Sequence, residues 1–111
     1  MIPVTDSLLE EMAEVIAKAV NPLQIILFGS HARGTASSQS DVDFLVVEDE
    51  SFGPERSRNR EMTRIWELLA PFMISKDILV FSRDEVERWK GTRNHVIARA
   101  LREGKVLYDR H

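Results

Sequence analysis

The chain has 111 residues, of which 43% are hydrophobic and 30% charged, with a formal net charge of −3 and no cysteine. This length predicts a single domain, residues 1–111, with one modest core. The lack of cysteine excludes disulfides, thiolate metal sites and cysteine nucleophiles, and the charge argues against direct binding of DNA or RNA. With no signal-peptide pattern at the N-terminus and no apolar run of membrane-spanning length, we expect a cytoplasmic protein that does not enter a membrane.

The first half of the chain predicts one long helix and two apolar strands. Apolar residues recur at helical spacing as far as Val20, after a cap at Thr5 or Asp6, and Asn21-Pro22 ends this helix. Short apolar, β-branched runs indicate buried strands. The remaining elements expected in this half are a strand at 23–28, a short helix at 31–33, a polar loop at 34–40 and a second strand at 41–48.

The second half predicts three helices and two strands. A helix over residues 55–70 carries an apolar stripe of Met62, Ile65, Trp66 and Leu69, so Trp66 is expected in the core, as is Trp89 further on. Its other face carries a row of arginines that we expect to be solvated and paired with Glu61 and Glu67, namely Arg56, Arg58, Arg60 and Arg64. The later elements are a strand at 76–81, a helix at 83–90 opened by a Ser82–Glu85 capping box, a helix from a Thr92 cap to Gly104, and a short strand at 105–108.

These elements predict an α/β fold, a small mixed β-sheet of three main strands and a fourth, with helices packed against it. The connection between the strands at 23–28 and 41–48 is short. Neighbouring strands joined in this way pair antiparallel, so we expect these two to lie side by side.

The segment from Gly29 to Asp43 carries the chemistry, and its first part is Gly29-Ser30 between a strand and a short helix. Glycine lets the backbone approach an oxyanion closely, and N–H groups that begin a helix attract phosphate. The Ser30 hydroxyl can add a donor, and Arg33 can reach the same phosphates or pair with a nearby carboxylate. A plain Gly-Ser turn would be the better interpretation if the dipeptide stood alone.

The second part is Asp41-Val42-Asp43 at the start of an apolar strand. Residues i and i+2 of a strand point to the same face, and two carboxylates placed this way can bind Mg²⁺. An acidic turn explains Asp41, but Asp43 precedes Phe-Leu-Val-Val, where an aspartate is disfavoured without a partner. Asp77 begins the third strand and can join the same face, although a turn residue is a slightly better interpretation of Asp77 alone.

Phe28-Gly29-Ser30, the pair Arg33-Gly34 and Ser40-Asp41-Val42-Asp43 together resemble the signature of the DNA polymerase β-type nucleotidyltransferase superfamily, and most of all its minimal nucleotidyltransferase (MNT) group. The resemblance covers the whole chain in length and element order. It implies that Asp41, Asp43 and Asp77 are catalytic and bind the metal, and that Gly29 and Ser30 hold phosphates. His31 stands where this group more often has arginine.

The resemblance further implies a Mg²⁺-dependent enzyme that moves AMP, or another NMP, from a nucleoside triphosphate such as ATP to a protein hydroxyl. It implies a HEPN-domain toxin as partner, with this chain as the antitoxin. Two other functions stay open as hypotheses: a binding antitoxin or degenerate subunit that neutralises its partner without chemistry, and a small-molecule nucleotidyltransferase, which would need a further helical domain. The acceptor, the base preference and the oligomeric state are not predicted.

Overall fold

The computed structural model describes residues 3–37 and 39–110, which form helices and strands in the predicted order. The helices are α1 (Asp6–Val20), α2 (Ser30–Arg33), α3 (Arg58–Leu68), α4 (Arg83–Trp89) and α5 (Val96–Glu103). The strands are β1 (Gln24–Phe28), β2 (Val42–Glu48), β3 (Lys76–Ser82) and β4 (Lys105–Asp109).

The four strands form one mixed sheet in the order β3-β2-β1-β4. β1 pairs antiparallel with β2 and with β4, and β2 pairs parallel with β3 through a crossover that contains α3. The predicted α/β fold is therefore confirmed, as is the antiparallel pairing of the first two strands.

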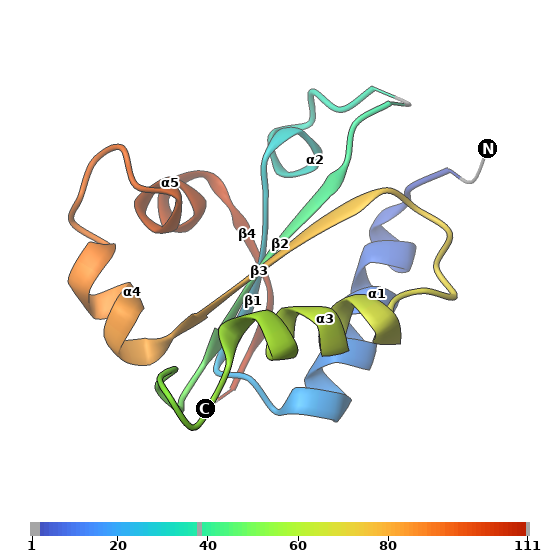
Figure 1. Cartoon of the computed structure of the whole chain (residues 1–111). Helices are drawn as coiled ribbons and strands as arrows, with labels where there is room; N and C mark the ends of the chain where they lie inside the picture. Colours follow the sequence, from blue (N-terminus) through green and yellow to red (C-terminus); the bar gives the residue numbers. More distant parts are fainter. Residues whose placement is uncertain (1–2, 38, 111) are drawn as a thin grey trace.

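Helices cover both faces of the sheet (Figure 1). On one face, α1 and α3 bury Met12, Ile16 and Ile65 against alternate strand residues such as Phe44 and Val46. On the other face, Ala100 of α5 and Val86 of α4 pack against the intervening strand residues, which include Ile26, Leu45, Val47 and Leu79. The alternation of the strands assigns every side chain of β2 to one of these two layers.

Three helix boundaries differ from the prediction by two residues or more, and the other differences are of one residue. α3 begins at Arg58 with Ser57 as its N-cap, because residues 53–56 form a turn closed by hydrogen bonds between Gly53 and Arg56. It ends at Leu68 rather than residue 70. α5 begins at Val96, and the His95 ring accepts the Ile97 N–H, so His95 and not Thr92 caps it.

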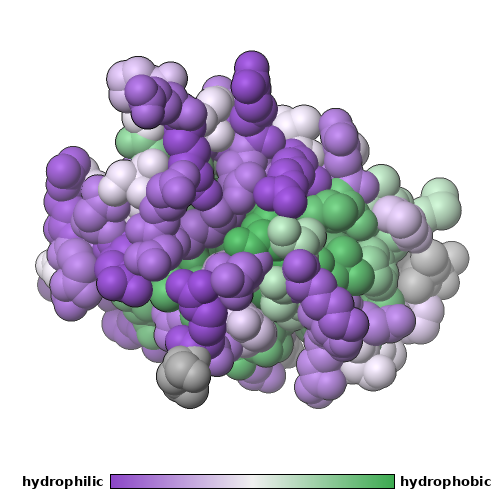
Figure 2. Space-filling model, turned by 90° about the horizontal axis from the view of Figure 1, so that it is seen from below, coloured by the Kyte–Doolittle hydropathy of each residue, from purple (hydrophilic) through white to green (hydrophobic). Residues whose placement is uncertain are grey.

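The prediction that both tryptophans lie in the core is wrong. Trp66 is 53% exposed, because Ile65 and Leu69 already fill the inward side of α3. Its ring lies under the Lys76 ammonium, 5.6 Å from the centroid. Trp89 is 37% exposed and stacks on the His95 ring at 4.8 Å, at the turn between α4 and α5. Figure 2 shows a hydrophobic band (green) between hydrophilic residues (purple) on the side where α1 and α3 lie.

The predicted solvation of the arginine row is wrong at Arg56 and Arg58, which are half-buried, whereas the predicted pairing with Glu61 is present. Arg56 lies before α3, where it pairs with Glu48 and Glu61, and its guanidinium stacks 4.2 Å from the Phe52 centroid. Arg58 donates to the Val80 carbonyl and pairs with Glu85, which links the start of α3 to β3 and α4. Helical periodicity relates only residues of the same helix, so it could not predict the contacts of Arg56 with Glu48 or of Arg58 with Val80 and Glu85.

No helix among the described residues has the length and apolarity required to cross a bilayer.

Candidate active site

The Gly29-Ser30 turn joins β1 to α2 at one end of the sheet. Gly29 has φ +75° and ψ −158°, a backbone conformation that is essentially confined to glycine. Its carbonyl accepts the N–H groups of Ala32 and Arg33, and the Ser30 carbonyl accepts that of Thr35. The N–H groups of Ser30 and His31, which begin the helix, have no carbonyl one turn back and so point outward.

Asp43 lies directly against this turn. It is the register partner of Phe28 on β1 and of Asp77 on β3. A Cβ placed on Gly29 would lie 2.2 Å from the Asp43 Oδ2 atom, so only glycine leaves room for this carboxylate. Strand alternation puts the side chains of Asp43 and Asp77 on the same sheet face as Leu45 and Leu79, the face covered by α4 and α5.

The carboxylates interact electrostatically. Partial burial, then the negative charges of Asp77 and Asp41, raise the pKa of Asp43, while the nearby His31 acts in the opposite direction. A carboxylate surrounded by like charges is destabilised in its ionised form unless a cation is near. The site therefore attracts positive charge.

Asp41 is placed differently from Asp43. It precedes β2 by one residue, is exposed, and accepts a hydrogen bond from the Ser75 hydroxyl. Within residues 3–37 and 39–110, no three carboxylate or imidazole side chains converge tightly enough to hold a metal ion as they stand. The structure thus brings Asp43 and Asp77 together and leaves Asp41 beside them, held by Ser75.

These residues are suited to Mg²⁺ in their chemistry. Magnesium prefers oxygen ligands and is commonly held by one or two carboxylates completed by water and substrate phosphates. Asp43 and Asp77 supply such oxygens on one face. Burial raises the pKa of Asp43, and the charges of Asp77 and Asp41 raise it further; a divalent cation would neutralise these charges. The donor set fits the ion that the sequence implied.

One hollow is lined by Asp43, and a second is lined by Ser75, the hydrogen-bond partner of Asp41. The first, of about 210 Å³, is lined by Phe28, Gly29, Arg33, Asp43, Arg99 and Glu103. In it Arg33 pairs with Glu103 at 3.8 Å. The second is larger, about 480 Å³, and its lining includes His31, Ser40, Met73 and Ser75. The His31 Nε2 atom lies 3.2 Å from the Ser40 carbonyl oxygen, so His31 supports the loop that borders the second hollow.

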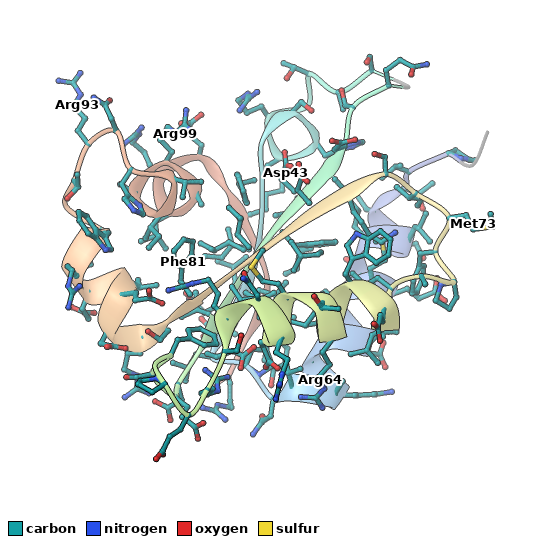
Figure 3. All side chains as sticks on the ribbon, in the orientation of Figure 1. Asp43, Arg64, Met73, Phe81, Arg93 and Arg99 are labelled. Atoms are coloured by element: carbon teal, nitrogen blue, oxygen red, sulfur yellow. The ribbon has the colours of Figure 1, made fainter. Side chains whose placement is uncertain are left out.

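Sequence reasoning did not find Arg99, Glu103 or Ser75. Arg99 and Glu103 reach the site from α5, more than fifty residues after Asp43, and no motif connects them with it. Ser75 precedes β3 and could have been suspected only from its position two residues before Asp77. Figure 3 shows Arg99 on α5 across the opening from Asp43.

Comparison with known proteins agrees with this geometry. Residues 9–75 match the family model described as "Nucleotidyltransferase domain". A protein of Methanocaldococcus jannaschii named "putative protein adenylyltransferase" is 33% identical over 88 residues, 77% of each chain.

Solved structures share the fold. One is a toxin–antitoxin complex with AMP-PNP, with a TM-score of 0.58 and 19% identity over 92% of this chain and 74% of that one. Another is a tri-AMPylated HEPN toxin in complex with MNT antitoxin from Shewanella oneidensis, with a TM-score of 0.58 and 17% identity over 96% of this chain and 74% of that one. The resemblance seen in the sequence is confirmed, and the chain belongs to the nucleotidyltransferase domain family.

Proposed function

We propose that this chain is a Mg²⁺-dependent adenylyltransferase that transfers AMP from ATP to a hydroxyl group of a HEPN-domain toxin, and that it acts as the antitoxin of that pair. The observation that carries the proposal is the contact between the Gly29 turn and the Asp43 carboxylate, beside Asp77 on the neighbouring strand. The name of the M. jannaschii relative and the AMPylated toxin in a structural neighbour support the choice of nucleotide and acceptor.

In this proposal Asp41, Asp43 and Asp77 hold Mg²⁺, and Gly29, Ser30 and Arg33 hold the phosphates of ATP. Mg²⁺ supplies neutralisation of charge on the reacting phosphate and on the leaving oxygen. Gly29 lets the phosphates approach the backbone, and the Ser30 hydroxyl and N–H donate hydrogen bonds to them. Asp43 stands between the turn and Asp77, so phosphates and carboxylates share one site.

The chemical step is an in-line displacement at the α-phosphorus. The acceptor oxygen forms a bond to that phosphorus while the bond from it to the oxygen of the β-phosphate breaks, and pyrophosphate leaves. Asp77 takes the proton of the acceptor hydroxyl. Positioning and electrostatic stabilisation supply most of the catalysis in reactions of this type.

A protein acceptor suits this site better than a nucleic acid or a small molecule. The hollow at Asp43, of about 210 Å³, is smaller than the roughly 300–1,000 Å³ of pockets that enclose a whole small-molecule ligand, which favours an acceptor that brings its own surface. A net charge of −3 disfavours DNA or RNA, whose binding relies on neutralisation of phosphates by lysine and arginine. A macromolecular partner that presents a hydroxyl group is therefore the acceptor we propose.

The test incubates the chain with a HEPN-domain protein, ATP and Mg²⁺, and measures the intact mass of the partner. A gain in AMP units is expected, and it should disappear in the double variant Asp41→Asn, Asp43→Asn. Asp49→Asn is a matched control, because Asp49 is an exposed aspartate that follows the opposite end of β2. If the double variant neutralises the toxin fully and no mass changes with either protein, the chain is a binding antitoxin without chemistry.

A further inference from the structure

Asp43 and Asp77 lie on one face of the sheet, and the elements that cover this face can contact a nucleotide bound to them. Both carboxylates share the face of Leu45 and Leu79, against which Ala100 of α5 packs. A nucleotide held at Asp43 therefore lies next to α5. The match to the family model covers residues 9–75, which does not include α5.

α5 brings one unpaired cation to this position. Arg99 lines the same hollow as Gly29 and Asp43. In the part of the chain that the structure describes, its guanidinium has no ion pair, whereas Arg33 across the hollow is 3.8 Å from Glu103. Arg99 and Glu103 are four residues apart, so they project from the same side of α5.

The size and charge of the hollow indicate what it accepts. About 210 Å³ is below the roughly 300–1,000 Å³ of pockets that enclose a whole drug-sized ligand. Its wall carries the carboxylates of Asp43 and Glu103 and two guanidinium groups, each of which can form paired, charge-assisted hydrogen bonds to phosphate oxygens. The hollow therefore suits phosphate groups better than a base or a ribose.

We propose that Arg99 binds the β- and γ-phosphates of the nucleotide, and that Glu103 holds Arg33 away from them until the nucleotide arrives. This inference rests on the proposed function. When the bond between the α-phosphorus and the leaving oxygen breaks, negative charge builds on pyrophosphate, and Arg99 neutralises part of it. Glu103 competes with the phosphates for Arg33, so it lowers the affinity of the site for nucleotide.

The test measures dissociation constants of ATP, AMP and inorganic tripolyphosphate in Mg²⁺ for the unmodified chain and four variants. Arg99→Gln is expected to weaken ATP and tripolyphosphate at least tenfold and to leave AMP unchanged. Glu103→Gln is expected to tighten ATP severalfold. Arg60→Gln is the matched control, because Arg60 is an exposed arginine on α3, on the other face of the sheet, and it should change nothing.

Arg99→Lys separates a role in binding from a role in folding. Lysine keeps the positive charge but lacks the planar guanidinium that forms paired hydrogen bonds. The affinity of Arg99→Lys for ATP should therefore lie between those of the unmodified chain and Arg99→Gln. The melting temperatures of these three proteins should be the same. Equal affinity for ATP in Arg99→Gln and the unmodified chain overturns this inference and leaves the proposed function intact. An equal loss for AMP and ATP also overturns it, since Arg99 would then contact the nucleoside part. If the unmodified chain binds neither ATP nor tripolyphosphate, both proposals are contradicted.

Discussion

At the scale of single residues, Gly29 and Gly34 form a matched pair. Both have positive φ, +75° and +76°, and they flank the same short helix. A Cβ on Gly29 would collide with the Asp43 Oδ2 atom, whereas a Cβ on Gly34 would meet nothing within 4 Å. Alanine at Gly34 would strain the backbone alone, whereas alanine at Gly29 would strain the backbone and also displace the Asp43 carboxylate. Comparing the two substitutions therefore separates these effects.

We predict that Gly29→Ala and Gly34→Ala both lower the free energy of unfolding by about 1–3 kcal/mol, because each forces alanine into a conformation that costs this much. Only Gly29→Ala should also lower nucleotide transfer, on the order of a hundredfold, which is what a displacement of about 1 Å at a reacting group can cost. Denaturant unfolding and transfer rates measure the two effects. Equal activity in the two variants would show that Gly29 has no role beyond its backbone conformation.

A second residue-scale feature is Glu48, buried at the end of β2 away from the site. Its Oε1 atom accepts from Arg56, while its Oε2 atom has no partner among the described residues. Burial and the neighbouring Glu61 raise the pKa of Glu48 from 4.5 to about 8, although Arg56 opposes the shift. The nearby Glu61 carboxyl therefore favours the protonated form of Glu48, and Arg56 favours the ionised form.

The raised pKa of Glu48 makes stability depend on pH. Between 4.5 and about 8 the folded chain holds a proton that the unfolded chain releases, so the contribution of Glu48 is complete below 4.5 and lost as the pH rises through about 8. We predict that Glu48→Gln melts at a higher temperature than the unmodified chain at pH 9, and that the gap narrows toward pH 5. Glu50→Gln is the control, because Glu50 pairs with the same Arg56 at 3.1 Å but is exposed. A gap in melting temperature that stays constant between pH 5 and pH 9 would contradict the raised pKa of Glu48.

At the scale of elements, what could be predicted depended on the distance along the chain between interacting residues. The capping box of Ser82 and Glu85 and the antiparallel pairing across residues 29–41 involve close neighbours, and both are present. The apolar runs of β1 and β2 could be identified because burial on both faces demands them. Helix ends were less certain, since the turn at Gly53–Arg56 leaves no periodic signal.

The candidate site was predictable to the same extent. Gly29, Ser30 and Asp43 lie within fifteen residues, and the parallel pairing that puts Asp77 beside Asp43 follows from the β2-α3-β3 order. Arg99 and Glu103 could not be predicted, because the packing of α5 on Ile26 and Leu45 is set by shape rather than by a local pattern. The role of Ser75 beside Asp41 depends on the loop before β3, which no motif describes.

At the scale of the whole molecule, the last strand completes the sheet that carries the site. β4 pairs with β1 at Gln24–Asp109, Ile25–Tyr108, Ile26–Val106 and Leu27–Lys105. Leu107 and Tyr108 also pack against the core beside α1. β1 in turn leads into the Gly29 turn, so the position of the phosphate-binding loop depends on a segment some seventy-five residues later in the chain.

We predict that a chain ending at residue 104 loses cooperative unfolding and associates. Without β4, the edge of β1 exposes unpaired backbone groups beside Ile25, Ile26 and Leu27, and an apolar edge of this kind pairs with other chains. The lost pairing and burial amount to several kcal/mol, a large part of the 5–15 kcal/mol typical of whole proteins. Circular dichroism melts and size-exclusion chromatography measure both effects, with Val106→Lys as control, because Val106 is 54% exposed and its substitution leaves the strand in place. If the shortened chain melts as sharply and as high as the full one and stays monomeric, β4 is an appendage and the folding unit ends at α5.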